Sequence, residues 1–245
     1  MSAFPYVLQQ DALPRLGLIV LQADETIEQD FRRLFGPDEA RLHVSRVPSG
    51  AELTPSTIAA MEAALPVAAS LLPASQPFDV VGYACTSGTT LIGAERVRDL
   101  IAAATQTHAT TDPLSAALAH CRALGLRRIG IISPYIASVA GPIRAAFEAG
   151  GIEVPDTLSF GEEIEARVAR IAPASIASAA RDLARRNTLD GIFLSCTNLR
   201  TLGILGPLAR ELGLPVLSSN QCLAWHMAVL AGMAPPLDGH GTRDG

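Results

Sequence analysis

The chain has 245 residues and a formal net charge of −5, with 49% hydrophobic and 18% charged residues. This composition excludes a disordered chain, and the length suits two α/β lobes of about 110–120 residues each. Basic residues cluster no further than pairs such as Arg127–Arg128, which argues against nucleic acid as a partner. No apolar run approaches the roughly 20 residues that span a bilayer, so no membrane partner is expected.

The N-terminal stretch lacks both the basic region and the continuous apolar core of a signal peptide, so we expect a cytoplasmic protein with reduced cysteines. Cys85, Cys121, Cys196 and Cys222 form no CxxC pair, and the five histidines are scattered. This spacing predicts no metal site. Cys121 and Cys222 fall in predicted helices, where we expect them to be packing residues.

The first half of the chain alternates strand and helix patterns after an arm, residues 1–15, in which two prolines discourage regular structure. Asp24 follows the first predicted strand, where it is either a helix cap or a site residue. Residues 108–111 are predicted as a short connection. We expect strands over 16–21, 41–47 and 80–84, and helices over 27–34, 55–72, 91–104 and 114–124.

The second half repeats the alternation. Tyr135 follows its first strand, and its phenol is placed to donate a hydrogen bond to a carboxylate. An acidic segment occupies residues 161–165. We expect strands over 128–133, 153–160, 191–195 and 214–218, and helices over 139–149, 176–187, 202–212 and 221–231.

Two stretches share one pattern, in which a buried strand leads through a cysteine into a loop of hydroxyl residues. They are VVGYACTSGTT (80–90) and GIFLSCTNLRT (191–201). Cys196 follows Cys85 by 111 positions, and the strand at Ile129 follows the strand at Gly17 by 112. This agreement predicts an internal duplication.

The duplication predicts an α/β fold of two similar three-layer lobes with parallel four-stranded sheets, related by a pseudo-twofold axis, with the site in the cleft between them. We assign residues 16–113 plus 219–234 to the first lobe and residues 114–218 to the second. The arm at 1–15 and a loose tail at 235–245 flank them.

Each cysteine is expected at the carboxyl edge of a parallel sheet, where ligands bind and the following helix directs N–H groups at the site. A thiol placed there is expected to ionise more easily than one in a core. Two thiols facing each other allow two reactions without a metal or organic cofactor. In racemisation, one thiolate removes a proton beside a carboxylate and the other thiol returns one on the opposite face. In cis–trans isomerisation, one thiolate adds to an activated alkene and the other thiol protonates the neighbouring carbon.

Both reactions need neutral donors for the charge that develops on the carboxylate. Thr86 and Ser87 follow the first cysteine, and Thr197 and Asn198 follow the second, so these four residues are expected to supply the donors.

Together with SPY at 133–135, the two cysteine motifs resemble the aspartate/glutamate racemase superfamily, specifically its branch of maleate cis–trans isomerases and arylmalonate decarboxylases. The resemblance implies two similar lobes, no cofactor, and a homodimer or higher homo-oligomer. It implies that Cys85 adds to the alkene, that Cys196 acts as acid and base, and that Tyr135 and the hydroxyl residues hold the carboxylates. Arylmalonate decarboxylases resemble this chain with only the second cysteine, so the pair favours an isomerase or a racemase.

The loop VLQADET (20–26) departs from the maleate isomerases, which carry an asparagine where this chain has Asp24. A second asparagine expected near residues 162–165 is also absent. An ionised Asp24 repels a dicarboxylate dianion but pairs with an ammonium group. The amino-acid racemases place an aspartate in this loop, which also resembles proteins linked to ectoine utilisation, whose substrate is an amino acid.

Our leading hypothesis is a cofactor-independent two-cysteine isomerase of a small carboxylic acid. Isomerisation of maleate to fumarate stands ahead of racemisation of an amino dicarboxylic or diamino acid derivative. A non-catalytic small-acid binding protein is the alternative from another class. A Cys85–Cys196 disulfide has little support because the CxxC setting is absent.

Overall fold

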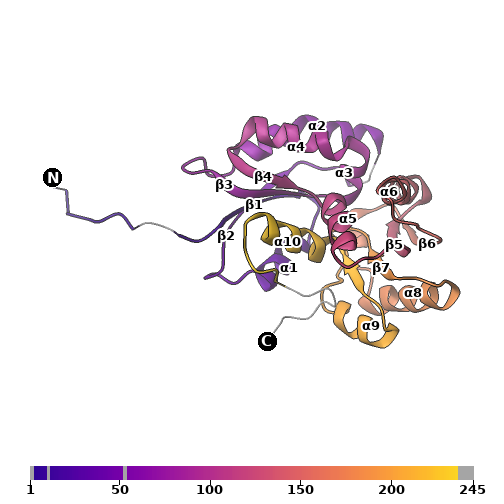
Figure 1. The fold of residues 1–245 in the computed structure, drawn as a ribbon. Coiled ribbons are helices and arrows are strands. Elements are labelled where there is room, and N and C mark those ends of the chain that lie inside the picture. Colours follow the sequence, from indigo (N-terminus) through magenta and orange to yellow (C-terminus); the bar gives the residue numbers. More distant parts are fainter. Residues whose placement is uncertain (1–2, 10–11, 52–53, 237–245) are drawn as a thin grey trace.

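The computed structural model describes residues 3–9, 12–51 and 54–236, and within them the chain forms two parallel four-stranded sheets (Figure 1). The sheets have equivalent strand orders, β2-β1-β3-β4 and β6-β5-β7-β8. The predicted α/β fold with two similar lobes is therefore confirmed. The strands are β1 (Arg15–Leu21), β2 (Arg41–Val47), β3 (Phe78–Ala84), β4 (Thr107–Thr111), β5 (Ile129–Tyr135), β6 (Thr157–Glu162), β7 (Gly191–Leu194) and β8 (Val216–Ser218).

The central strands of each sheet read as continuous apolar runs because helices cover both of their faces. In β1, the side chains from Leu16 to Leu21 are all buried, and β3 is buried from Val80 to Ala84. Strands β5 and β7 are buried along their whole length. The apolar sequence pattern thus fixes which strands lie in the middle.

The first sheet lies between two helical layers (Figure 1). On one face, α1 (Ile27–Leu34) and α10 (Ser219–Leu230) bury Phe31 and Met227 against β1 and β3. On the other face lie α2 (Pro55–Ser70) and α4 (Ala94–Ala104), which contribute Leu65, Val97 and Ile101 to a separate core.

The second sheet has the same three-layer build. Helices α5 (Pro113–Ala123) and α6 (Ala137–Ala149) cover one face, with Phe147 packed on Phe193 of β7. Helices α8 (Pro173–Arg186) and α9 (Leu205–Leu212) cover the other face, where Leu183 and Leu208 are buried.

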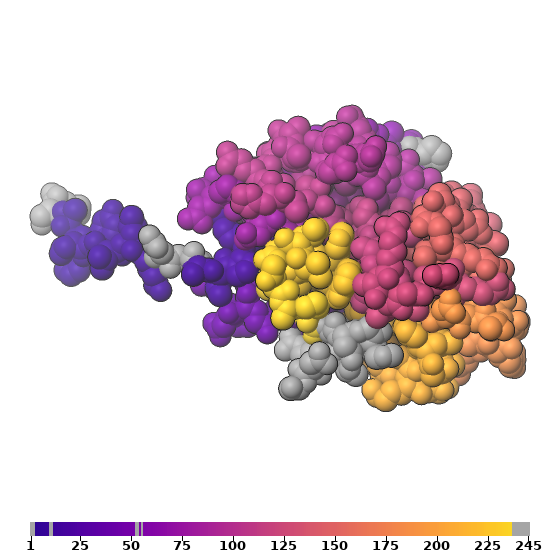
Figure 2. Space-filling view, viewed as in Figure 1, coloured from indigo at the N-terminus to yellow at the C-terminus, as the bar shows by residue number. Residues whose placement is uncertain are grey.

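Helix α10 follows the last strand of the second sheet but packs on β3 of the first sheet and on α5. Figure 2 shows it as a yellow surface between the first lobe and α5. Its Leu223 and Met227 belong to a first-sheet core, which supports the proposed assignment of residues 219–234 to the first lobe.

Several predicted segments differ from the structure. Residues 108–111, expected to be a connection, belong to β4, because a threonine-rich stretch serves as an edge strand paired with β3. Residues 86–90, expected to be a turn, open α3 (Thr86–Ile92). The acidic segment leads into a short helix, α7 (Glu165–Val168), and the residues after Cys196 form turns up to α9 instead of a helix from 202.

Within the N-terminal arm, residues 3–9 carry no helix or strand and extend away from the body (Figures 1 and 2). The first strand begins one residue earlier than predicted, at Arg15. Residues 237–245 of the predicted tail lie outside the described residues. Among the described helices, none is both long and apolar enough to cross a bilayer.

Candidate active site

Cys85 follows β3 directly and caps the N-terminus of α3. Its Sγ accepts a hydrogen bond from the Gly88 N–H at 3.1 Å and lies 3.7 Å from Ser87 Oγ. A Cβ at position 88 would approach this sulfur to 2.8 Å, so glycine is needed for the close backbone contact. The sequence therefore places a thiol where a helix N-terminus supplies donors.

Cys196 follows β7 at the equivalent place in the second sheet. It has φ = 124°, the single positive φ among the described residues other than glycine. Such a backbone costs about 1–3 kcal/mol and persists where its surroundings hold it. Here the Cys196 N–H donates to Ser219 Oγ at 2.9 Å, and the Asn198 N–H donates to the Cys196 Sγ at 3.3 Å.

Hydrogen bonds join the two cysteine loops across the lobes. The Thr197 hydroxyl donates to the carbonyl of Ala84, the residue before Cys85, at 3.3 Å. Thr86 Oγ1 lies 2.8 Å from Ser219 Oγ, which also accepts from the Cys196 N–H. The carboxyl edges of the two sheets therefore meet here, in the region that we call the junction.

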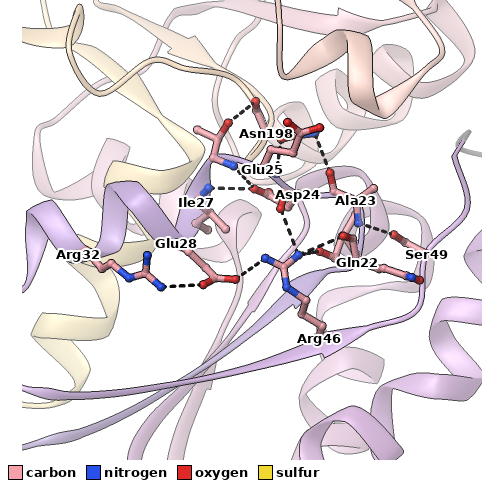
Figure 3. A network of polar contacts seen from close by, with 12 residues as sticks. Gln22, Ala23, Asp24, Glu25, Ile27, Glu28, Arg32, Arg46, Ser49 and Asn198 are labelled. Carbon is pink, nitrogen blue, oxygen red and sulfur yellow. Dashed lines mark hydrogen bonds and ion pairs between the residues drawn. The ribbon is translucent and has the colours of Figure 1, made fainter.

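The loop after β1 enters the junction from the first lobe. Asp24 Oδ1 accepts hydrogen bonds from the Thr26 and Ile27 N–H groups at 2.8 and 2.9 Å, so it stabilises the start of α1. Asn198 of the second lobe lies over this loop, and its Oδ1 accepts from the Glu25 N–H at 2.9 Å (Figure 3). Asp24 is thus both a helix-capping side chain and a residue of the junction.

Tyr135, the last residue of β5, contributes its phenol hydroxyl to the junction. Its hydroxyl donates to Glu165 Oε1 at 2.8 Å and lies 3.1 Å from Cys196 Sγ. Asn198 Nδ2 donates to Glu165 Oε2 at 3.2 Å. The phenol therefore stands between a thiol and a buried carboxyl group.

The structure brings every sequence-predicted site residue to the junction and buries it, with exposed fractions between 2% and 5%. These residues are Asp24, Cys85, Thr86, Ser87, Tyr135, Cys196, Thr197 and Asn198.

Glu165 and Ser219 were missed as site residues. The available signals were the acidic segment around Glu165 and the serine immediately after β8. Neither feature reveals that Glu165 contacts Tyr135, 30 residues earlier in the chain, or that Ser219 contacts Cys196, 23 residues earlier.

The expectation of easily ionised thiols is wrong for this closed junction. Burial raises the pKa of Cys85 to about 12, although the Gly88 N–H and the Ser87 hydroxyl lower it. Burial also raises the pKa of Cys196 well above its ordinary value, and the Glu165 carboxyl adds to this rise. Desolvation therefore outweighs the helix N-terminus in this structure.

Two buried carboxyl groups, Asp24 and Glu165, lie near enough to the thiols to raise the pKa of both. Burial raises the pKa of Asp24 and of Glu165, and the charge of Asp24 raises the pKa of Glu165 further. Asp30 has a pKa raised by burial as well, although Asn220 donates to its carboxyl group. Burial therefore disfavours the ionised form of each of these carboxyl groups.

These raised pKa values set a pH dependence of stability. At a pH above the ordinary glutamate pKa of 4.5, Glu165 loses its proton in the unfolded chain but keeps it in the folded protein. The contribution of Glu165 to the free energy of unfolding therefore falls as pH rises toward its folded-state pKa. We expect Glu165→Gln to stabilise the protein at pH 8, within the range of about 0.5–3 kcal/mol usual for single substitutions. The gain should vanish at pH 4. Urea denaturation at both pH values checks this, and an equal gain at both would contradict it.

Within the described residues, no group of three or more histidine, cysteine, aspartate or glutamate side chains is arranged to hold a metal ion. The groups that the junction offers to a ligand are thiols, hydroxyls, an amide, a phenol and two carboxyls. This set suits proton transfer and nucleophilic addition at a small polar molecule.

Comparison with known proteins finds similarity along nearly the whole chain. The family model described as arylmalonate decarboxylase matches residues 17–243. The arylmalonate decarboxylase of Bordetella bronchiseptica is 32% identical over 119 residues, which cover 48% of this chain and only half of that protein. The maleate isomerase of Nocardia farcinica is 26% identical over 216 residues, 84% of this chain and 85% of that enzyme.

Solved structures share the fold. The maleate isomerase of Pseudomonas putida S16 with maleate has a TM-score of 0.81 at 24% identity, covering 94% of this chain and 96% of that one. The Nocardia farcinica maleate cis–trans isomerase with a covalently bound succinylcysteine intermediate has a TM-score of 0.79 at 20% identity, covering 96% and 100%. A liganded arylmalonate decarboxylase mutant has a TM-score of 0.79 at 28% identity, covering 89% and 93%.

Proposed function

The chain belongs to the arylmalonate decarboxylase family, and from this premise we propose that it is a cofactor-independent isomerase of a small carboxylate that works through Cys85 and Cys196. The observation that carries the proposal is the pair of cysteines at equivalent strand ends of two like sheets, joined across the junction by hydrogen bonds. The maleate isomerase relatives make maleate the leading substrate and fumarate the product.

The cis–trans route uses both thiols in turn. The Cys85 thiolate forms a C–S bond to one alkene carbon, and the electron pair of the double bond takes a proton from the Cys196 thiol at the other carbon. The new single bond rotates. Cys196 then removes that proton, the double bond re-forms and the C–S bond breaks. The succinylcysteine in the Nocardia enzyme is the kind of adduct that the first step would produce.

The donors of the junction have distinct roles in this scheme. The Gly88 N–H and the Ser87 hydroxyl stabilise the Cys85 thiolate once the junction opens to admit the substrate. Thr86, Thr197, Asn198 and Tyr135 are proposed to hold the carboxylates and the charge that develops on them. We also propose, from the resemblance to the family, a cytoplasmic homodimer or higher homo-oligomer.

Racemisation of an amino acid is the second candidate. One observation favours it specifically, namely that two buried carboxyl groups, Asp24 and Glu165, share the junction with the thiols. In this reaction one thiolate removes the proton from the α-carbon, and the other thiol supplies a proton to the opposite face.

Proton NMR of the protein in deuterium oxide tests the proposal. A fumarate signal growing from maleate supports the cis–trans route, and deuterium entering the α-carbon of an amino acid supports racemisation. Ligand binding with neither reaction, for maleate and for a panel of L- and D-amino acids, would favour a binding protein and refute the isomerase.

A further inference from the structure

We propose that the N-terminal arm of one copy of this chain docks on helix α2 of a second copy, so that two chains exchange their arms reciprocally. The inference rests on the homo-oligomer proposed above, whose interface it assigns, and not on the reaction that the two cysteines carry out.

Large apolar side chains that are more than 60% exposed occur in two segments of the described chain. The four in the arm are between 81% and 97% exposed, and they are Phe4, Tyr6, Val7 and Leu8. The two at the end of α2 are Val67 at 64% and Leu71 at 71%. Every other large apolar side chain among the described residues is at most 45% exposed. Scattered exposed apolar residues are ordinary, whereas a gathering of them marks an interaction surface.

The arm is suited to an apolar and uncharged protein surface. Residues 3–9 form no helix or strand, Pro5 favours an extended backbone, and the segment extends away from its own body (Figures 1 and 2). Residues 1–14 contain one charged residue, Asp11, and no lysine or arginine. Segments that bind a membrane surface are typically amphipathic helices rich in basic residues. The composition of the arm therefore favours another protein chain as its partner.

Helix α2 presents such an uncharged surface. It packs on α3, α4 and β2, and its one charged residue, Glu62, pairs with Arg96 of α4. A helix that is apolar on every side is normally covered on every side. The outward side of α2 is nevertheless exposed. We call it the α2 face, and its residues, spaced by three or four positions, are Ala59, Ala60, Ala63, Val67 and Leu71.

The arm leaves the first lobe near the C-terminal end of α2. Arg15, the first residue of β1, donates its N–H to Asp79 Oδ2 at 2.7 Å. Its guanidinium donates to the carbonyls of Gln76 at 2.8 Å and Pro73 at 3.2 Å, in the loop that follows α2. Each chain thus carries the arm and the end of the α2 face at one end of the same lobe. A twofold axis near this end lets each arm reach the α2 face of the other chain.

The dimensions of the arm and the α2 face agree. Seven extended residues span about 23–25 Å, and the 16-residue helix α2 is about 24 Å long, so residues 3–9 can lie along it. An aromatic side chain buries roughly 150–250 Å². With the covered face and the reciprocal arm included, Phe4 and Tyr6 account for about 1,200–2,000 Å², the range of stable interfaces. Neither residues 3–9 nor the α2 face contains a charged residue, so docking leaves no charge unpaired.

Sedimentation velocity of the full-length protein over a range of concentrations tests the exchange. We expect the parent to be a dimer. The double substitution Phe4→Ser and Tyr6→Ser should raise its dissociation constant by about a hundredfold or more, because buried aromatic residues dominate interfaces. Val67→Lys on the α2 face should have the same effect, and a lysine near the end of a helix leaves the helix intact. Circular dichroism verifies that each variant is folded.

Phe160→Ser is the matched control, since Phe160 is an exposed aromatic residue on β6 of the second lobe. It should leave the dissociation constant unchanged. A mixture of the two monomeric variants adds a stricter test. The arm variant retains an intact α2 face and Val67→Lys retains an intact arm, so the mixture should form heterodimers at a concentration where each variant alone is monomeric.

The outcomes separate the interface from the oligomer. A dimer that withstands either the arm substitutions or Val67→Lys overturns the arm exchange and leaves the homo-oligomer standing, as does a mixture without heterodimers. A monomeric parent overturns both the exchange and the homo-oligomer. None of these results bears on the two-cysteine isomerase, which the NMR experiment tests by itself.

Discussion

Replacing Cys85 or Cys196 by serine is expected to reduce turnover by roughly 10³-fold or more, because groups that act as a unit lose most of their effect together. A serine hydroxyl is a far weaker acid than a thiol, so neither attack on carbon nor proton return proceeds at neutral pH. The measurement is initial rate by NMR for each single variant and for the double variant. The double variant should be little worse than either single one.

Cys121→Ala provides the control for loss of a thiol. Cys121 is buried in α5, in a second-sheet core cluster that includes none of the described junction residues. We expect this variant to lose stability, by about 1 kcal/mol, and to keep its turnover. If either serine variant at the junction retained most of the parent rate, the two-cysteine mechanism would be wrong.

The strained backbone at Cys196 offers a second test of the two-cysteine mechanism. Because Cys196 sits at φ = 124°, glycine at this position should relieve strain while removing the thiol. Cys196→Gly is therefore expected to be inactive yet no less stable than Cys196→Ser. A general unfolding of the junction would instead lower stability in both variants.

The sequence pattern predicted the architecture because the two halves repeat. Nearly equal spacing between the cysteines and between the opening strands anticipated two sheets of one strand order, with Cys85 and Cys196 at matching ends. The eight predicted site residues meet because each lies at the carboxyl end of a strand or in the segment that follows it, and parallel strands share one carboxyl edge.

What failed depends on contacts between residues that lie far apart in the sequence. Residues 86–90 are poor helix formers, yet Thr86 Oγ1 is held by the hydroxyl of Ser219, the first residue of α10, and Cys85 caps the helix. The polar stretch of β4 gains its partner only from β3. The raised thiol pKa arises from burial, which a local motif does not encode.

Asn198→Ala is expected to destabilise the protein by about 2–4 kcal/mol and to reduce turnover with it, because several buried groups lose their partner at once. The Glu25 N–H loses its acceptor, and the Glu165 carbonyl and Oε2 lose their donor. Urea denaturation and NMR rates measure both effects. Asn187→Ala is the control, since Asn187 at the end of α8 bonds only Asp156 and the Leu183 carbonyl among the described residues.

Asn198→Asp separates the loss of hydrogen bonds from the loss of packing. It keeps the size of the side chain and the acceptor for the Glu25 N–H, but it removes the Nδ2 donor and places a third carboxyl beside Asp24 and Glu165. We expect it to be at least as destabilising as Asn198→Ala at pH 8 and to recover at pH 5, where the added carboxyl is more readily protonated. If the aspartate variant matched the parent in stability at pH 8, repulsion among the junction carboxyls would be negligible.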